Sequence, residues 1–200
     1  MKKTTTLKEH IIEESLKLFS VKGYMSTSIT DIIDASGTSK GGFYNHFKSK
    51  EDLFYEILSA ARKIWRERNL HGIYDELRPL FKIQKILENY RDRYLADSMN
   101  FPGGCIFVNL TVELSDQSPR LAKEVNKGFI RLEKMIRRFL DEEKKSGGIS
   151  QSINTENASN MIFSGLLGAC VLYTSDKARK RLDSTIKSLI LYLHSIDLKK

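Results

Sequence analysis

Residues 28–50, SITDIIDASGTSKGGFYNHFKSK, constrain the fold more than any other part of this chain. Ser28 stands three residues before Asp31, and Ser49 stands three residues before Asp52. This capping-box spacing predicts that a helix begins just after each serine, because the hydroxyl and the acid satisfy the free N–H groups of a helix start. The segment therefore predicts short helices joined by tight turns.

Glycines between these two starts limit the lengths of the helices. Gly37 permits the left-handed conformation in which many helices end, and Ser39 can cap the next helix. That next helix must be short, because Gly41 and Gly42 each weaken it by about 1 kcal/mol. A short glycine-bearing helix after a tight turn indicates a helix-turn-helix whose second helix enters the major groove of DNA.

A longer pattern surrounds this segment, from residue 7 to residue 53. It comprises Leu18-Phe19-x-x-x-Gly23-Tyr24, Thr27-Ser28-Ile29-x-Asp31-Ile32, Ala35-x-Gly37 and Ser39-Lys40-Gly41-x-Phe43-Tyr44-x-His46-Phe47-x-Ser49-Lys50-x-x-Leu53. At these positions the chain resembles the TetR family of transcriptional regulators. The resemblance implies a symmetric homodimer that binds double-stranded operator DNA, usually as a repressor, and that a small-molecule effector releases.

The rest of the sequence favours an all-α fold of about nine helices. Only three prolines occur, and alternating β-branched residues are nearly absent. We expect a helix-turn-helix DNA-binding domain over residues 1–50 and a helical effector-binding and dimerisation domain over residues 51–200. Beyond the first three helices, the expected helices span about 49–69, 80–96, 105–114, 119–145, 154–173 and 178–196. The helix from residue 49 to 69 is expected to link the two domains.

Composition narrows the class of protein further. The net charge of +8 and the pI of about 9.4 are compatible with a polyanionic partner. The chain has no run of ~18 apolar residues, so the sequence predicts no membrane span. Residues 1–6 lack the apolar stretch of a signal peptide. We therefore expect a cytoplasmic protein. Two cysteines and four scattered histidines form no metal-ligand or catalytic pattern. We therefore expect no enzyme activity, no metal and no cofactor.

The expected DNA contacts lie in the helix-turn-helix. No arginine precedes Arg62, so the head lacks the bidentate reader of guanine, and base specificity falls to Lys40, Thr30, Tyr44 and DNA shape. A solvated Lys40 and a structural His46 are the alternatives. Lys50 resembles the phosphate-binding lysine of the family, whereas Phe43 and Phe47 are expected in the core. The predicted DNA-binding residues are Ser28, Thr30, Thr38, Ser39, Lys40, Gly41, Tyr44, His46 and Lys50.

The last two helices are predicted to form the dimer interface, because each carries an apolar stripe and the first of them also has small residues that permit close approach. Both stripes could instead fill the core of the subunit. The predicted interface residues are Ala158, Ile162, Gly165, Ala169, Leu182, Ile186, Leu189, Ile190 and Leu193.

The resemblance also implies an effector cavity, and its mainly apolar candidate residues suit an apolar or aromatic small molecule. Aromatic and methionine residues at helical spacing are also common in cores. The predicted effector-binding residues are Trp65, Tyr90, Phe101, Cys105, Phe107, Asn109, Met161 and Phe163.

Residues 101–119, with Cys105, Asn109 and Glu113, resemble a subgroup of the family that includes regulators responding to electrophiles through a cysteine. Cys105 follows two glycines at an expected helix start, where the helix dipole favours the thiolate. An alternative function is therefore a redox- or electrophile-sensing repressor, although Cys105 could instead serve in packing. Cys170, among small residues, is expected to pack. A third hypothesis is an architectural factor that uses the head to reach DNA.

Overall fold

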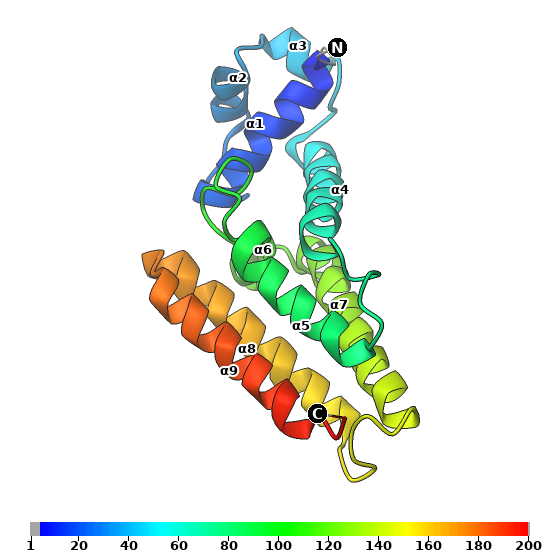
Figure 1. The fold of residues 1–200 in the computed structure, drawn as a ribbon. Helices are drawn as coiled ribbons and strands as arrows, with labels where there is room; N and C mark the ends of the chain where they lie inside the picture. Colours follow the sequence, from blue (N-terminus) through cyan, green and yellow to red (C-terminus); the bar gives the residue numbers. More distant parts are fainter. Residues whose placement is uncertain (1–4, 200) are drawn as a thin grey trace. The chain divides into compact units, whose positions relative to one another are not determined.

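The computed structural model describes residues 5–199. Residues 1–4 of the predicted first domain, and residue 200, lie outside this range. Within residues 5–199 the chain forms nine α-helices and one π-helix, with no strand, which confirms the all-α prediction (Figure 1). The elements are α1 (Leu7–Lys22), α2 (Ile29–Ser36), α3 (Lys40–Tyr44), α4 (Lys50–Asn69), α5 (Pro79–Asn89), η1 (Tyr90–Tyr94), α6 (Ile106–Gln117), α7 (Pro119–Lys145), α8 (Thr155–Asp176) and α9 (Arg179–Ile196).

The predicted capping signals place the starts of the early helices. The predicted capping box at Ser28 opens α2, and Gly37 ends α2 in the left-handed region at φ 59°. The structure also shows a complete capping box at Thr6, which opens α1. At α4 the hydroxyl of Ser49 accepts the N–H of Asp52 at 3.0 Å, as predicted. In a complete capping box the Asp52 carboxylate would accept the N–H of Ser49. Here it accepts the N–H of Lys48, one residue earlier, at 3.1 Å.

The fifth helix is shorter than predicted. Its α-helical part ends at Asn89 instead of residue 96, and the π-helix η1 follows. The N–H of Leu95 donates to the carbonyl of Tyr90 at 2.9 Å, which is the wider spacing of a π-turn. No proline or glycine lies at the change from α-helix to π-helix, so the helical sequence pattern runs on to residue 96 and predicts a longer α-helix.

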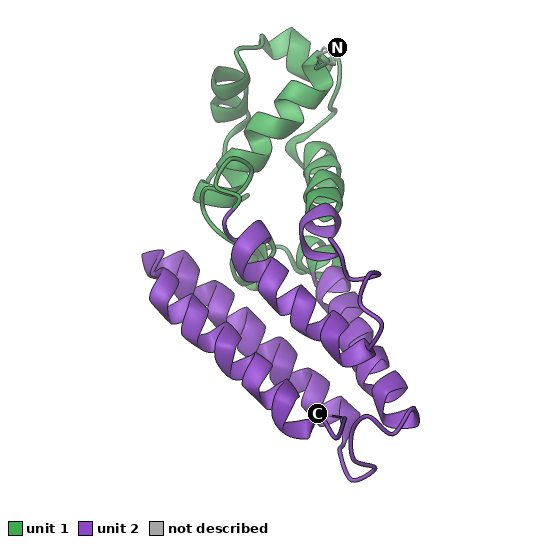
Figure 2. Cartoon of the chain, in the orientation of Figure 1, with its two compact units in different colours: residues 1–64, 97–125 green, residues 65–96, 126–200 purple. Residues whose placement is uncertain are grey.

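The chain divides into two compact units (Figure 2). Unit 1 comprises residues 1–64 and 97–125 and holds α1–α3, most of α4, α6 and the start of α7; unit 2 comprises residues 65–96 and 126–200. The predicted boundary after residue 50 does not coincide with this division, because α4 and α6 pack with the first three helices. In unit 1, Phe43 and Phe47 are no more than 1% exposed, so the prediction that both are core residues is confirmed.

In unit 2, α8 and α9 lie side by side (Figure 1), and their apolar stripes pack against each other within the chain. The predicted interface residues Ala158, Ile162, Ala169, Leu182, Ile186, Leu189 and Leu193 are buried, and Gly165 and Ile190 are half-buried. A Cβ at Gly165 would lie 2.8 Å from the Leu189 side chain. These side chains therefore pack within the subunit, and their contact with a second copy stays a prediction.

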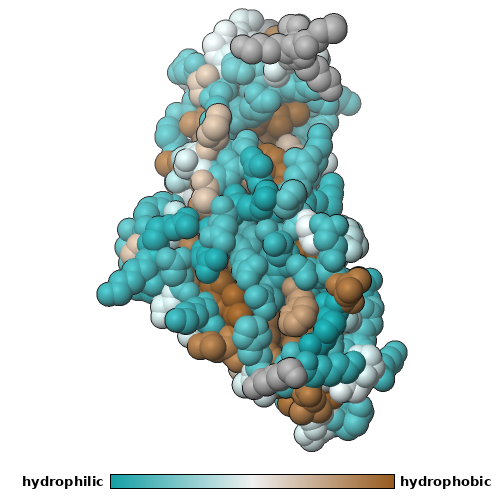
Figure 3. All heavy atoms as spheres, in the orientation of Figure 1, coloured by the Kyte–Doolittle hydropathy of each residue, from teal (hydrophilic) through white to brown (hydrophobic). Residues whose placement is uncertain are grey.

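Other apolar residues of α8 and α9 face solvent. Met161, Val171, Leu172 and Leu191 are 40–56% exposed. Gly168 on α8 also faces open space, because a Cβ added there would have no other side chain or distant backbone atom of the described residues within 4 Å. In the view of Figure 3, hydrophobic atoms also show between hydrophilic ones over unit 2.

By length and composition alone, α8 could also cross a membrane. One 18-residue window has a mean hydropathy of 1.2 and is 33% buried. Our expectation of no such segment rested on unbroken apolar runs, which α8 lacks. Helices of soluble proteins pass the same averaged test.

Candidate nucleic-acid interface

The hydroxyl of Ser39 starts the second helix of the helix-turn-helix by accepting the N–H of Gly42 at 3.0 Å. The five-residue α3 that follows turns Phe43 into the core and leaves Tyr44 46% exposed. The predicted contact residues Ser28, Thr30, Ser39, Lys40, Gly41, Tyr44 and His46 are exposed, whereas Thr38 and Lys50 are half-buried. Basic, hydroxyl and aromatic groups from α2, the turn and α3 are thus available to a partner of unit 1.

Gly42 leaves room for the side chain of Thr38 in the turn. A Cβ at this position would lie 2.4 Å from the hydroxyl oxygen of Thr38. The Thr38 N–H donates to the Ile33 carbonyl at 3.2 Å, which fixes the turn just before α3. The Thr38 side chain therefore occupies the space that a Cβ at position 42 would take.

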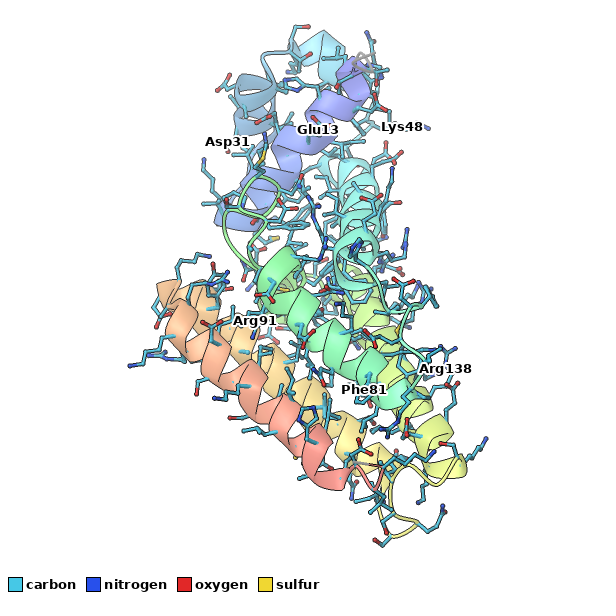
Figure 4. The ribbon with its side chains drawn as sticks, in the orientation of Figure 1. Glu13, Asp31, Lys48, Phe81, Arg91 and Arg138 are labelled. Carbon is cyan, nitrogen blue, oxygen red and sulfur yellow. The ribbon has the colours of Figure 1, made fainter. Side chains whose placement is uncertain are left out.

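The first helix of the pair is held by a charged cap. The Ser28 hydroxyl accepts the N–H of Asp31 at 3.0 Å and donates to its carboxylate at 2.7 Å. Lys22 pairs with Asp31 at 3.1 Å (Asp31 is labelled in Figure 4). The hydrogen bonds from Ser28, and then that from Lys22, lower the pKa of Asp31 to about 2. Ser28 thus acts as a helix cap, and its contact with DNA stays a prediction.

Lys50 has internal partners. Its ammonium donates to the carbonyls of Tyr24 and Thr27, both at 2.9 Å, and lies 4.3 Å from the centre of the Tyr24 ring. Burial lowers the pKa of Lys50, while nearby Glu113 opposes that shift. An ammonium has three donors, so two carbonyls leave one N–H for phosphate. A phosphate contact stays a prediction.

Two predicted effector residues meet in unit 2. The indole N–H of Trp65 donates to the Tyr90 hydroxyl at 2.7 Å, and the two rings pack edge to face. Tyr90 also packs edge to face on Tyr94, the last residue of η1. Because π-turns are often found at functional sites, this aromatic group is a candidate effector wall.

Two further predicted effector residues belong to unit 2. In unit 2, Phe163 packs on Phe129 with ring centres 5.8 Å apart, and Met161 is 45% exposed. The remaining candidates belong to unit 1, where Phe101, Cys105 and Phe107 are buried and Asn109 is half-buried.

A pocket of about 350 Å³ lies in unit 2, and no predicted effector residue lines it. The Nε2 atom of His194 lies 2.9 Å from the side-chain oxygen of Gln84 at its edge. Its lining consists of Glu76, Phe81, Gln84, Lys85, Glu88 and His194. Sequence reasoning missed this pocket because these residues form no motif. Among the described residues, no group of three or more His, Cys, Asp or Glu side chains could hold a metal ion.

These features define a helix-turn-helix DNA-binding protein with an all-helical body. Residues 11–57 match the model of "Bacterial regulatory proteins, tetR family", and residues 79–189, more than half of the chain, match "Tetracyclin repressor-like, C-terminal domain". The chain belongs to the TetR family of transcriptional regulators.

Individual proteins agree with this assignment. The transcriptional repressor DhaR of Mycobacterium sp. (strain GP1) is 26% identical over 90% of this chain and 88% of its own length. An uncharacterised HTH-type regulator of Lactococcus lactis subsp. lactis is 32% identical over 64% of this chain and 65% of its own length, slightly under two thirds. A TetR regulator from Chloroflexus aurantiacus J-10-fl superposes with a TM-score of 0.87 at 27% identity, covering 96% of each chain.

Proposed function

We propose that this protein is a cytoplasmic transcriptional repressor that binds palindromic operator DNA as a homodimer and is released by an apolar or aromatic small molecule. The observation that carries the proposal is the exposed row of basic, hydroxyl and aromatic side chains over α3 and its preceding turn, in a TetR-family chain. Selection of duplexes from a random pool tests it: the selected DNA should contain two inverted half-sites. A wild-type protein that enriches no symmetric sequence would contradict the proposal.

Lys40 is the basic side chain best placed to read the groove, because it is exposed at the first position of the short recognition helix. Replacing Lys40 with alanine should weaken binding to the selected duplex by about 1–3 kcal/mol and relax the preference at one position of each half-site. Fluorescence anisotropy with the selected duplex and its single-base variants measures both effects. Lys63→Ala removes the same charge from an exposed position of α4 in unit 1 and serves as the matched control. If both variants lose affinity equally and without a change in base preference, Lys40 does not read the sequence.

The aromatic group around Trp65 supports the effector part of the proposal. Trp65 is the only tryptophan in the chain, so tryptophan emission, excited selectively over the eight tyrosines, reports on this group alone. An effector that contacts Trp65 or displaces Tyr90 should change the emission of Trp65 at the concentrations that release the operator.

Dimerisation is assigned to the outward faces of α8 and α9, since their inward faces are used within the subunit. A palindromic site calls for two heads related by twofold symmetry. The exposed apolar side chains on these helices supply a surface for a second copy.

The alternative of a cysteine-based sensor has weaker support. Cys105 lies at the N-cap of α6, as the sequence predicts, but it is only 1% exposed. A thiol inside the core reacts slowly with an electrophile unless the core opens. If replacing Cys105 with serine abolished release by an electrophile, this alternative would be favoured.

A further inference from the structure

The segment over residues 101–119 stands out in the sequence, and neither DNA contact nor the aromatic effector group accounts for Asn109 and Glu113 in it. The structure shows that both side chains are directed at the backbone of α1 and the turn after it, within unit 1. Their partners lie about ninety positions earlier in the chain.

Glu113 binds the turn between α1 and α2. Its carboxylate accepts the backbone N–H of Tyr24 at 2.7 Å and that of Met25 at 2.9 Å. Gly23, with φ 80°, allows this approach, because a Cβ there would lie 2.4 Å from a Glu113 oxygen. Two charge-assisted hydrogen bonds therefore fix the backbone that enters the helix-turn-helix.

Lys50 binds the same turn through its carbonyls. Tyr24 donates its N–H to Glu113 of α6 and offers its carbonyl to Lys50 of α4. Thr27 supplies the second carbonyl for Lys50, one residue before the N-cap of α2. Both polar groups of the Tyr24 backbone are thereby held by charged side chains from two different helices.

Asn109 extends this attachment to the end of α1. Its side-chain amide donates to the Ser20 carbonyl at 3.1 Å, and the N–H of Gly103 donates to the Ser20 hydroxyl at 2.9 Å. A Cβ at Gly103 would lie 1.7 Å from the Ser20 carbonyl oxygen, so only glycine fits. The glycine, the asparagine and the glutamate of the motif thus all contact one stretch of backbone.

We propose that Glu113 and Asn109 are positioning residues for DNA binding, which set the orientation of the helix-turn-helix by fixing residues 20–25 against α6. This inference rests on the proposed function, since it assumes that the helix-turn-helix reads DNA. In this proposal, the residues of segment 101–119 hold the helix-turn-helix in the orientation that DNA binding needs. A change in α6 would then reach the reading helices through hydrogen bonds within unit 1.

Glu113→Gln tests the proposal, because glutamine keeps the shape but retains only one acceptor oxygen. We expect at least a ~10-fold loss of affinity for the selected duplex, equivalent to about 1.4 kcal/mol. The slope of affinity against salt should be unchanged, since Glu113 touches no phosphate in this assignment. The amide protons of Tyr24 and Met25 should exchange faster with solvent than in the wild type. Glu113→Ala should show larger changes of the same kind.

The sign of the effect separates positioning from electrostatics. Removing an acid from a DNA-binding unit strengthens binding if charge alone matters. Asp116→Asn is the matched control: it removes the same charge from an exposed site on α6, and it should leave exchange at the turn unchanged.

Equal or tighter binding by Glu113→Gln, with wild-type exchange at both amides, would overturn the inference. If the wild-type protein selects no duplex, the proposed function fails, and exchange at Tyr24 and Met25 still decides whether Glu113 fixes the turn.

Discussion

Replacing Arg78 with methionine is expected to destabilise the protein by about 3–5 kcal/mol, because it leaves two buried carboxylates without their cation. Arg78 lies at the N-cap of α5, with Glu143 on α7 and Asp197 after α9 as its partners. The side chains of these two acids are only 1% and 7% exposed.

The geometry explains the size of this effect. The guanidinium of Arg78 donates to Glu143 at 2.7 and 3.1 Å and to Asp197 at 2.7 and 3.0 Å. The second oxygen of Glu143 accepts the N–H of Leu80 at 3.1 Å. The hydrogen bonds from Arg78 lower the pKa of Asp197 below its ordinary value of 3.8. Methionine retains much of the packing but none of these donors.

The pH dependence has a definite sign. In the wild type the folded-state pKa of Asp197 is lowered, so its stabilising contribution is complete above the ordinary pKa and is lost as the pH falls through the lowered one. Without Arg78, burial disfavours ionisation of the Asp197 carboxylate, and protonation relieves that cost. The stability difference between variant and wild type should therefore shrink on acidification toward pH 3.8.

Denaturant unfolding at several pH values measures this difference. Arg91→Met is the matched control, because Arg91 (labelled in Figure 4) pairs with Asp92 and Asp183, which are about half exposed. We expect a loss of no more than about 1 kcal/mol for this control. Equal losses in the two variants, or a difference independent of pH, would show that burial of the Arg78 cluster does not determine its contribution.

The sequence predicts local structure well where the partners lie within a few residues of each other. Ser28 with Asp31, and Ser39 before Gly41, indicate helix starts that the structure confirms, because capping depends on groups three residues apart. The start of α3 at Ser39 in turn predicts that Lys40, Gly41 and Tyr44 lie on one short helix, where all three are exposed. Prediction from local signals fails at η1, since a change from α to π turns needs no breaking residue.

Long-range partners were not predictable in this way. Lys50 lies at a helix start, and this position is typical of a phosphate-binding lysine. The position does not show whether the ammonium faces solvent or binds backbone carbonyls twenty-three or more residues earlier, as it does in the structure. Glu113 carries no local sign that it binds the Tyr24 backbone. An apolar stripe likewise shows that a face is buried without showing by what, and so the stripes that contain Ile162 and Ile186 fit a partner subunit and a neighbouring helix of the same subunit equally well.

The exposed face of α8 leads to the second large prediction: Val171→Asp should convert a dimeric protein to a monomer. Val171 is 47% exposed, one turn from Gly168 and beside Leu172. Twofold symmetry places two carboxylates in the interface for each substitution. A cost of about 3 kcal/mol or more for burying unpaired charge corresponds to over ~100-fold in Kd.

Sedimentation velocity at micromolar concentration measures the change. Leu77→Asp is the matched control, since Leu77 is 96% exposed in the segment before α5 of the same unit, and it should leave the dimer intact. Gly165→Ala should not change the order of association, because its Cβ would meet Leu189 within the subunit. A wild-type monomer, or a Val171→Asp dimer of unchanged Kd, would exclude this face.

DNA binding provides an independent reading of the same substitution. Two linked heads bind a palindrome with the second contact made at a high effective concentration, whereas separate heads bind each half-site independently. The Val171→Asp protein should therefore bind a full palindrome about as weakly as a single half-site. Its base preference should stay that of the wild type, because Val171 lies in unit 2 and the reading helix lies in unit 1. A variant that is monomeric yet keeps wild-type affinity for the palindrome would show that the two heads do not act through this interface.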